Sequence, residues 1–171
     1  RRCTCLPPGA KEERDLYDVE EAGVKMISFK KILCPIDYSD CSARALRYAA
    51  GMALKDSARL YLMHVIDRRV FDYGGPVYEV PSVPDAETVV RLEEKLRESI
   101  PGEVRGEIQV ETVVTMGIPA EEILKAARDE GVDVIVMGTH GRTGMAHTVM
   151  GSVAENVVRR ASCPVLTVRQ S

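Results

Sequence analysis

One stretch decides the fold of this chain: Val132-Asp-Val-Ile-Val-Met-Gly-Thr-His-Gly-Arg-Thr-Gly-Met-Ala-His-Thr-Val-Met-Gly-Ser-Val153. Its short apolar run over 134–137 is bounded by Gly138 and is typical of a strand buried on both faces. A glycine-rich loop follows, and Ser152 opens a helical pattern. Glycine lets backbone N–H groups approach an anion closely, and the first N–H groups of a helix lack partners within the helix. The stretch therefore has the parts of a phosphate-binding site.

The glycine spacing identifies the kind of site. Two residues separate Gly138 from Gly141, and Gly151-Ser152 follows after nine more. This is neither the dinucleotide fingerprint nor the P-loop. It resembles the nucleotide-binding motif of the universal stress protein family, in the branch that binds ATP. Segments 30–39, 64–67 and 162–168 resemble the first, second and last strands of the same family, so the resemblance covers roughly residues 28–170.

The composition bounds the class of protein. A chain of 171 residues predicts one domain. With 45% hydrophobic residues, 5% aromatic residues and no tryptophan, its core is expected to be aliphatic, as in a parallel sheet. A net charge of −3 without a basic run argues against nucleic-acid binding. No apolar stretch suits a membrane span and no secretory signal is visible, so a cytoplasmic protein is expected, in keeping with its odd count of five cysteines.

The apolar periodicity predicts strands alternating with helices. The strands are expected at 32–36, 58–65, 108–114, 134–137 and 165–168, and the helices at 42–55, 87–98, 119–128 and 152–160. This alternation predicts an α/β fold, a single-domain doubly wound parallel sheet with right-handed crossovers. The resemblance implies five strands in the order 3-2-1-4-5, with helices on both faces. The first and fourth strands then meet at the switch point, where ligands bind.

Two segments fall outside this pattern. Residues 1–25 are predicted to be a poorly ordered extension, or vector-derived or start-site sequence, and residues 26–171 to be the nucleotide-binding domain. A short helix over 14–21 that docks on a neighbour is the alternative. The connection over 67–84 is either an unstructured loop or a functional lid.

The candidate site residues each have two interpretations. Asp37 could accept ribose hydroxyls or the adenine amino group, or hold metal-bound water, or it could be a helix-capping or turn aspartate. Gly138 and Gly141 could direct amides toward a nucleotide, or only end a strand and form a turn. Gly151 and Ser152 could bind phosphate oxygens through N–H groups and the hydroxyl, while Ser152 alternatively caps its helix.

The resemblance adds the remaining residues. It implies that Val65 offers backbone groups and an apolar wall to adenine, and that the ligand is ATP or another adenine nucleotide, with or without Mg²⁺. Arg142 could pair with phosphate or be a solvated loop arginine. The full predicted binding set is Pro35, Ile36, Asp37, Val65, Met137, Gly138, Gly141, Arg142, Gly151, Ser152 and Val153.

No nucleophile–base arrangement stands out, and neither His140 nor His147 has an identifiable carboxylate partner. We therefore expect an ATP-binding stress-response or regulatory protein rather than a dedicated enzyme. A slow ATPase or nucleotidyl-transfer enzyme, and a scaffold with an unused pocket, are the alternatives. A homodimer is expected through the last strand (Val165, Leu166, Val168), since an exposed apolar edge invites pairing, unless residues 1–25 cover that edge.

Overall fold

The computed structural model describes residues 27–71, 84–141 and 150–169. Its strands are β1 (Lys31–Pro35), β2 (Arg59–Asp67), β3 (Gln109–Gly117), β4 (Val134–Gly138) and β5 (Val165–Val168). Its α-helices are α1 (Asp40–Asp56), α2 (Ala86–Glu98), α3 (Pro119–Asp129) and α4 (Ser152–Arg160), and short 3-10 turns are η2 (Arg68–Phe71) and η3 (Gly102–Val104). The predicted extension, most of the 67–84 connection, Arg142 and His147 lie outside the described residues.

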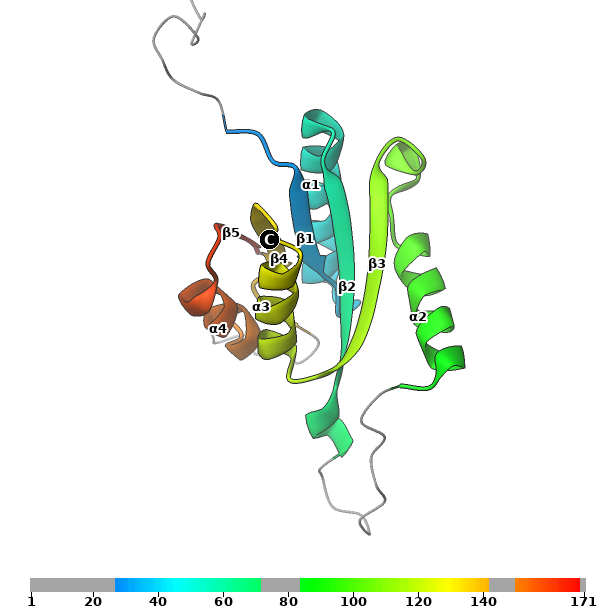
Figure 1. Cartoon of the computed structure of the whole chain (residues 1–171), viewed down its shortest axis with the longest axis vertical. Helices are drawn as coiled ribbons and strands as arrows, with labels where there is room; N and C mark the ends of the chain where they lie inside the picture. The colour runs from blue at the N-terminus through cyan, green and yellow to red at the C-terminus, as the bar shows by residue number, and fades with distance from the viewer. Residues whose placement is uncertain (1–26, 72–83, 142–149, 170–171) are drawn as a thin grey trace, which may run out of the picture.

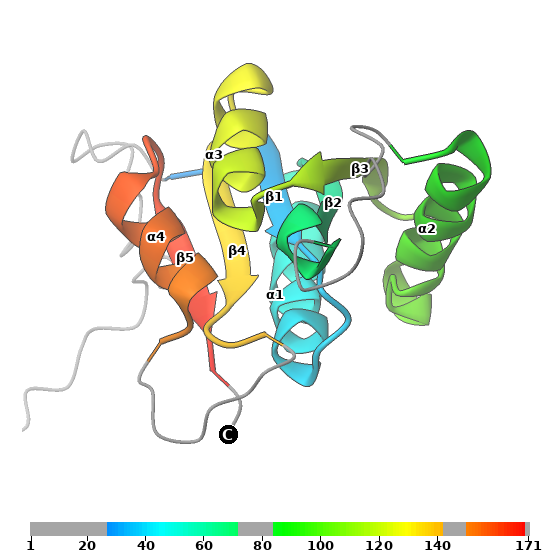
Figure 2. The same ribbon diagram turned by 90° about the horizontal axis from the view of Figure 1, so that it is seen from below.

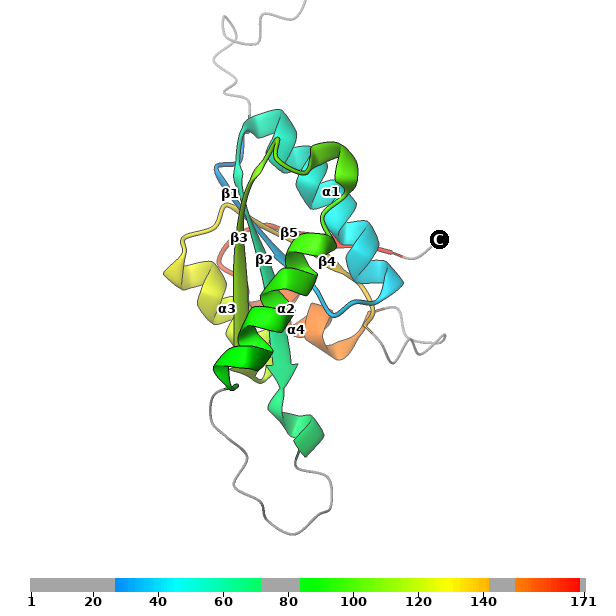
Figure 3. The same cartoon turned by 90° about the vertical axis from the view of Figure 1, so that its right-hand side faces the viewer.

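The strands form one parallel sheet in the order β3-β2-β1-β4-β5, which confirms the predicted fold class and strand order (Figure 1). Helices α3 and α4 lie side by side on one face (Figure 2). Helices α1 and α2 cover the other face, with α2 beside the β3 edge (Figure 3). None of the helices in the described ranges is long and apolar enough to cross a membrane.

The core is aliphatic and lies in two layers, because successive strand side chains point to opposite faces of the sheet. On one face Ile32 and Cys34 pack against α1, whose buried Ala45 and Ala49 allow a close approach. On the other face Leu33 belongs to the cluster that contacts α3 and α4. The central strands are therefore buried on both sides, as their continuous apolar runs predicted.

Local chemistry sets the helix starts. The Ser39 hydroxyl accepts the Ser42 N–H (3.2 Å) and caps α1. Helix α4 begins at Ser152, with Gly151 as the capping residue and no side-chain cap. The alternative that Ser152 caps its helix is therefore wrong, because Ser152 is already the first helical residue.

Strand β2 extends beyond β1, and this difference opens the crevice at the switch point. Nine residues of β2 pair with β3, from Arg59 to Asp67. Only the first five pair with β1, where the register ends at Pro35 opposite Met63. The predicted end of this strand, Val65, is two residues short, because β3 continues to support β2 after β1 has turned away.

Candidate functional site

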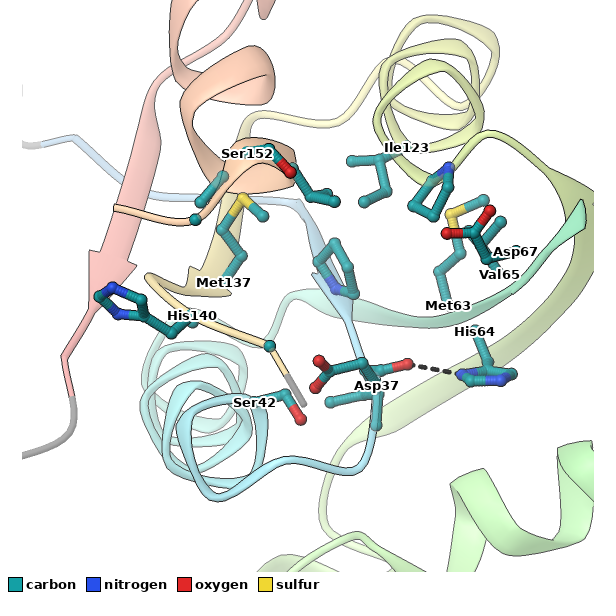
Figure 4. Close-up of a pocket in the computed structure, with 18 of the residues that line it drawn as sticks. Asp37, Ser42, Met63, His64, Val65, Asp67, Ile123, Met137, His140 and Ser152 are labelled. Atoms are coloured by element: carbon teal, nitrogen blue, oxygen red, sulfur yellow. Dashed lines mark hydrogen bonds between the residues drawn. The ribbon is translucent and has the colours of Figure 1, made fainter. Parts of the chain in front are cut away.

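A cavity of about 530 Å³ lies at the carboxyl ends of β1, β2 and β4, within the range of small-molecule sites. Every predicted binding residue in the described ranges lines it, namely Pro35, Ile36, Asp37, Val65, Met137, Gly138, Gly141, Gly151, Ser152 and Val153. Further lining residues absent from the prediction are Ser42, Met63, His64, Ile66, Asp67, Arg69, Pro119, Ile123, Thr139, His140 and Ala154. Many of these are labelled in Figure 4.

Asp37 follows β1 and connects two loops. Its Oδ1 accepts hydrogen bonds from the Ser39 N–H (3.0 Å) and hydroxyl (2.6 Å), which makes it a turn aspartate. Tyr38 has a φ of 65°, in the left-handed region, which turns the chain toward α1. The second carboxylate oxygen, Oδ2, lies close to Gly141. The turn interpretation therefore accounts for Oδ1, while Asp37 still lines the cavity.

The end of β2 directs backbone groups toward the crevice, beyond the point where its pairing with β1 ends. The Ile36 N–H donates to the Met63 carbonyl (2.7 Å), so the backbone groups of Met63 face β1. Along a parallel strand, residues two apart direct their N–H and C=O to the same side. Val65 therefore directs a donor and an acceptor to the side where β1 no longer runs. This arrangement suits a planar ligand with a donor beside an acceptor.

The N-terminus of α4 forms another part of the wall. The Gly151 N–H, one of the predicted phosphate donors, donates to the Thr139 carbonyl (2.8 Å) in this structure. A Cβ on Gly151 would lie 3.2 Å from the same carbonyl oxygen, which explains the glycine. Ser152 and Val153, in the first turn of α4, line the cavity. The positive end of the helix dipole therefore lies at the cavity wall, where it favours an anion.

Gly138 has a packing role. A Cβ there would lie 2.8 Å from Cβ and 2.9 Å from the carbonyl carbon of Cys41, and 3.1 Å from the Ser42 nitrogen. Glycine thus lets the end of β4 touch the start of α1. Cys41, on the other side of this contact, is buried.

His64 is a site residue that sequence reasoning missed. Its ring is buried, and Nδ1 donates to the Ile36 carbonyl (2.7 Å), since a carbonyl can only accept. The His64 ring lies 4.8 Å from the Tyr38 ring, over which the Lys95 ammonium sits at 4.0 Å. These contacts fix the turn after β1. They could not be predicted from a local sequence pattern, because α2 and β2 meet Tyr38 only in the folded chain.

An ion pair between Asp67 and Arg69 also lines the cavity. The Arg69 Nη2 lies 2.6 Å from Oδ2 of Asp67, and the hydrogen bond from Arg69 lowers the pKa of this carboxyl. The signal available in the sequence was an acid and an arginine two residues apart at the end of a strand. Together with Asp37, these two residues carry the carboxylate and guanidinium charges of the described cavity wall.

His140 lies in the same wall, with Nδ1 3.0 Å from the Thr139 hydroxyl. In the described ranges no three His, Cys, Asp or Glu side chains gather as metal ligands. The arrangement is thus a concave site with an open strand edge and a helix N-terminus, suited to holding an anionic ligand with a planar ring.

The comparisons with known proteins agree with this fold. The profile described as "Universal stress protein family" matches residues 28–169. Universal stress protein MJ0577 of Methanocaldococcus jannaschii is 32% identical over 159 residues, covering 84% of this chain and 97% of that protein. A solved structure of MJ0577 superposes with a TM-score of 0.66 at 34% identity, covering 85% of this chain and 99% of that one.

Two further solved structures share the fold at lower identity. A universal stress protein in complex with cAMP has a TM-score of 0.62 at 21% identity, covering 85% of this chain and all (100%) of that one. The universal stress protein from Archaeoglobus fulgidus in complex with dAMP has a TM-score of 0.55 at 24% identity, covering 84% and 99%. With its profile match extending over most of its length, this chain belongs to the universal stress protein family.

Proposed function

We propose that this protein binds ATP, or another adenine nucleotide, in the cavity at the switch point and acts as a stress-response or regulatory protein. One observation carries the proposal: a single cavity joins the open backbone of Val65 to the N-terminus of α4 at Ser152. Adenine presents its amino donor beside a ring-nitrogen acceptor, which complements one backbone C=O and one N–H. The helix N-terminus complements phosphate.

The spacing of the strands supports this orientation. Strand β1 lies between β2 and β4, so the two outer strands of this trio are separated by roughly 10 Å, twice the strand spacing. A nucleotide has a comparable distance between its base and its phosphate, which lie at opposite ends of the ribose. Asp37 lies after the middle strand, where the ribose hydroxyls would be, and its carboxylate would accept their hydrogen bonds.

The comparisons support the ligand class. Two solved structures of this fold hold cAMP and dAMP, which are both adenine nucleotides. For ATP, a Mg²⁺ ion fits the donor set, because this cation prefers a few carboxylate and phosphate oxygens and keeps several waters. Asp37 would hold one of those waters. We assign binding rather than turnover as the function, and place the protein in the cytoplasm, where its thiols would stay reduced.

Proline substitution tests the role of the helix amide. Ser152→Pro removes the first N–H of α4, while proline is tolerated at this position and Gly151 already has the extended backbone that precedes proline. We expect ATP affinity to fall about tenfold, the effect of one charge-assisted hydrogen bond. Ser152→Ala keeps the N–H and reports on the hydroxyl alone. Ala86→Pro, at the first position of α2 after an extended Asp85, is the matched control and should bind like wild type.

Isothermal titration with ATP and GTP, followed by a phosphate-release assay over hours, completes the test. Adenine readout by Val65 predicts tighter binding of ATP than of GTP, because guanine reverses the donor and the acceptor at these positions. Failure of the wild-type protein to bind any adenine nucleotide would reject the function. Steady release of phosphate over these hours would instead favour the slow-ATPase alternative.

We also propose that the protein forms a homodimer through β5. The Val168 carbonyl accepts the Thr139 N–H (2.9 Å), so Val168 faces β4, and the alternation directs the backbone of Val165 and Thr167 to the open edge. Leu166 is 39% exposed beside this edge. Pairing of two β5 strands around a two-fold axis would give these backbone groups hydrogen-bond partners and would bury Leu166.

A further inference from the structure

The 3-10 turn after β2 brings Arg69 to the cavity, where Asp67 binds its half-exposed side chain. The Arg69 N–H donates to Oδ1 of Asp67 (3.0 Å), its Nε donates to the same oxygen (2.9 Å), and its Nη2 donates to Oδ2 (2.6 Å). Two side-chain nitrogens of the guanidinium thus meet both oxygens of one carboxylate. This forked geometry fixes the plane of the guanidinium as well as its position.

The pair lies at one end of the cavity. Asp67 is two residues beyond Val65 on the same face of β2, and Figure 4 shows the two residues beside each other. The N-terminus of α4 is tied to the end of β4 by the Gly151–Thr139 hydrogen bond, and β4 lies two strand spacings, roughly 10 Å, from β2. In the described part of the cavity wall, Arg69 is the one arginine or lysine. It therefore sits where the proposed function puts the base and not where it puts the phosphates.

The rest of this end of the cavity is apolar. Met63, Pro119 and Ile123 line it together with Val65. These side chains can pack on a purine ring but cannot hold it in one orientation. A guanidinium is planar, delocalised and weakly hydrated, and it stacks on aromatic faces. Since Asp67 already orients the group, stacking costs little additional side-chain entropy.

We propose that Arg69, oriented by Asp67, is a base-binding residue that stacks on the base of the bound nucleotide. This inference rests on the proposed nucleotide-binding function and adds a base-recognition residue to it. Stacking uses the face of the guanidinium, so the ion pair with Asp67 persists in the complex. Because the contact is with the base, its contribution is the same for adenosine, AMP and ATP.

Calorimetry on the full chain tests this with two variants. Arg69→Met keeps the length and apolar character of the side chain but removes the planar cation. Arg69→Lys keeps the charge but removes the plane. We expect both variants to bind adenosine, AMP and ATP about fivefold more weakly than wild type does. This factor corresponds to the loss of one cation–π interaction. Arg59→Met is the matched control, since Arg59 pairs with Glu111 at the opposite end of β2, and it should bind like wild type.

The possible outcomes separate the two proposals. Unchanged affinity in Arg69→Met, with wild type binding normally, overturns the role of Arg69 and leaves the nucleotide site intact. A loss that grows from adenosine to ATP and shrinks with added salt also overturns it, because it would mean a phosphate contact. Normal binding by Arg69→Lys would show that charge suffices and would overturn stacking. No binding of adenine compounds by the wild type would reject the proposed function itself.

Discussion

Oδ2 of Asp37 lies 2.5 Å from the position that a Cβ atom on Gly141 would occupy. The loops after β1 and β4, which are far apart in the sequence, thus touch inside the cavity. The contact needs glycine at 141, because a Cβ there would overlap the Asp37 carboxylate. It couples the position of a proposed ribose acceptor to the glycine loop.

Gly141→Ala is expected to weaken ATP binding about tenfold with a stability change of less than about 1 kcal/mol, since the added methyl displaces a side-chain carboxylate rather than backbone. Gly51→Ala is the control: a Cβ there meets nothing within 4 Å, so the variant should keep wild-type affinity. It should also unfold at a higher temperature than wild type, because alanine favours the interior of helix α1 more than glycine does. Wild-type ATP affinity in Gly141→Ala, measured by calorimetry, would reject the role of this contact.

Gly138→Ala is expected to act on stability instead. Its methyl would meet the Cys41 carbonyl carbon at 2.9 Å and the Ser42 nitrogen at 3.1 Å, and backbone atoms cannot rotate away. The strained contact should lower the free energy of unfolding by about 1–3 kcal/mol in urea titrations. A stability equal to that of wild type would show that α1 can shift outward from the sheet at no cost.

Cys34 should make the protein sensitive to alkaline pH. Burial raises the pKa of its thiol far above the ordinary value. The folded state then favours the neutral thiol, so the stability is complete below the unfolded pKa of about 8.5 and falls as pH rises toward the folded pKa. Urea unfolding between pH 8 and pH 10 should show a shallower loss for Cys34→Ala than for wild type, although burial also raises the pKa of Cys163. Equal slopes in the two proteins would assign the loss to other groups.

Thr167→Pro should weaken the proposed dimer. The Thr167 N–H points to the open edge of β5, so proline removes a donor for the partner strand and leaves the bonds to β4 in place. Light scattering at micromolar concentration should give a dimer for wild type and a monomer for this variant, with similar melting temperatures. A wild type that stays monomeric at every concentration would reject the dimer and favour an edge covered by residues 1–25.

A chain that begins at Met26 should keep its melting temperature and its ATP affinity. In the described part of the chain, the ties at the start of the domain come after this residue: the Phe29 N–H donates to the Asp56 carboxylate (2.9 Å) and the Lys30 N–H to that of Asp133 (2.6 Å). A clear fall in either quantity on calorimetry and thermal melting would show that residues 1–25 dock on the domain. Dimers that appear only in the shortened chain would show that they cover β5.

The sequence by itself determined the elements and the kind of crevice. Continuous apolar runs bounded by glycine predict buried parallel strands, and α4 and β5 have the predicted bounds, 152–160 and 165–168. The helices could be predicted because apolar periodicity, and the small residues such as Ala45 and Ala49 on the buried face of α1, are local properties of one element. The strand order came from resemblance to a family, and the sheet confirmed it.

The tertiary structure alone decided which groups the site presents. Whether Val65 offers its backbone to a ligand depends on where β1 ends, not on any residue near Val65. Likewise, the Gly151 N–H donates to the Thr139 carbonyl, which lies in another segment. Position 138 has no room for a Cβ because Cys41 of α1 packs against it. A hydrogen bond or a steric contact between distant segments exists only after the sheet has formed. Periodicity records which side chains are buried, but the pairing of backbone groups is a property of the assembled fold.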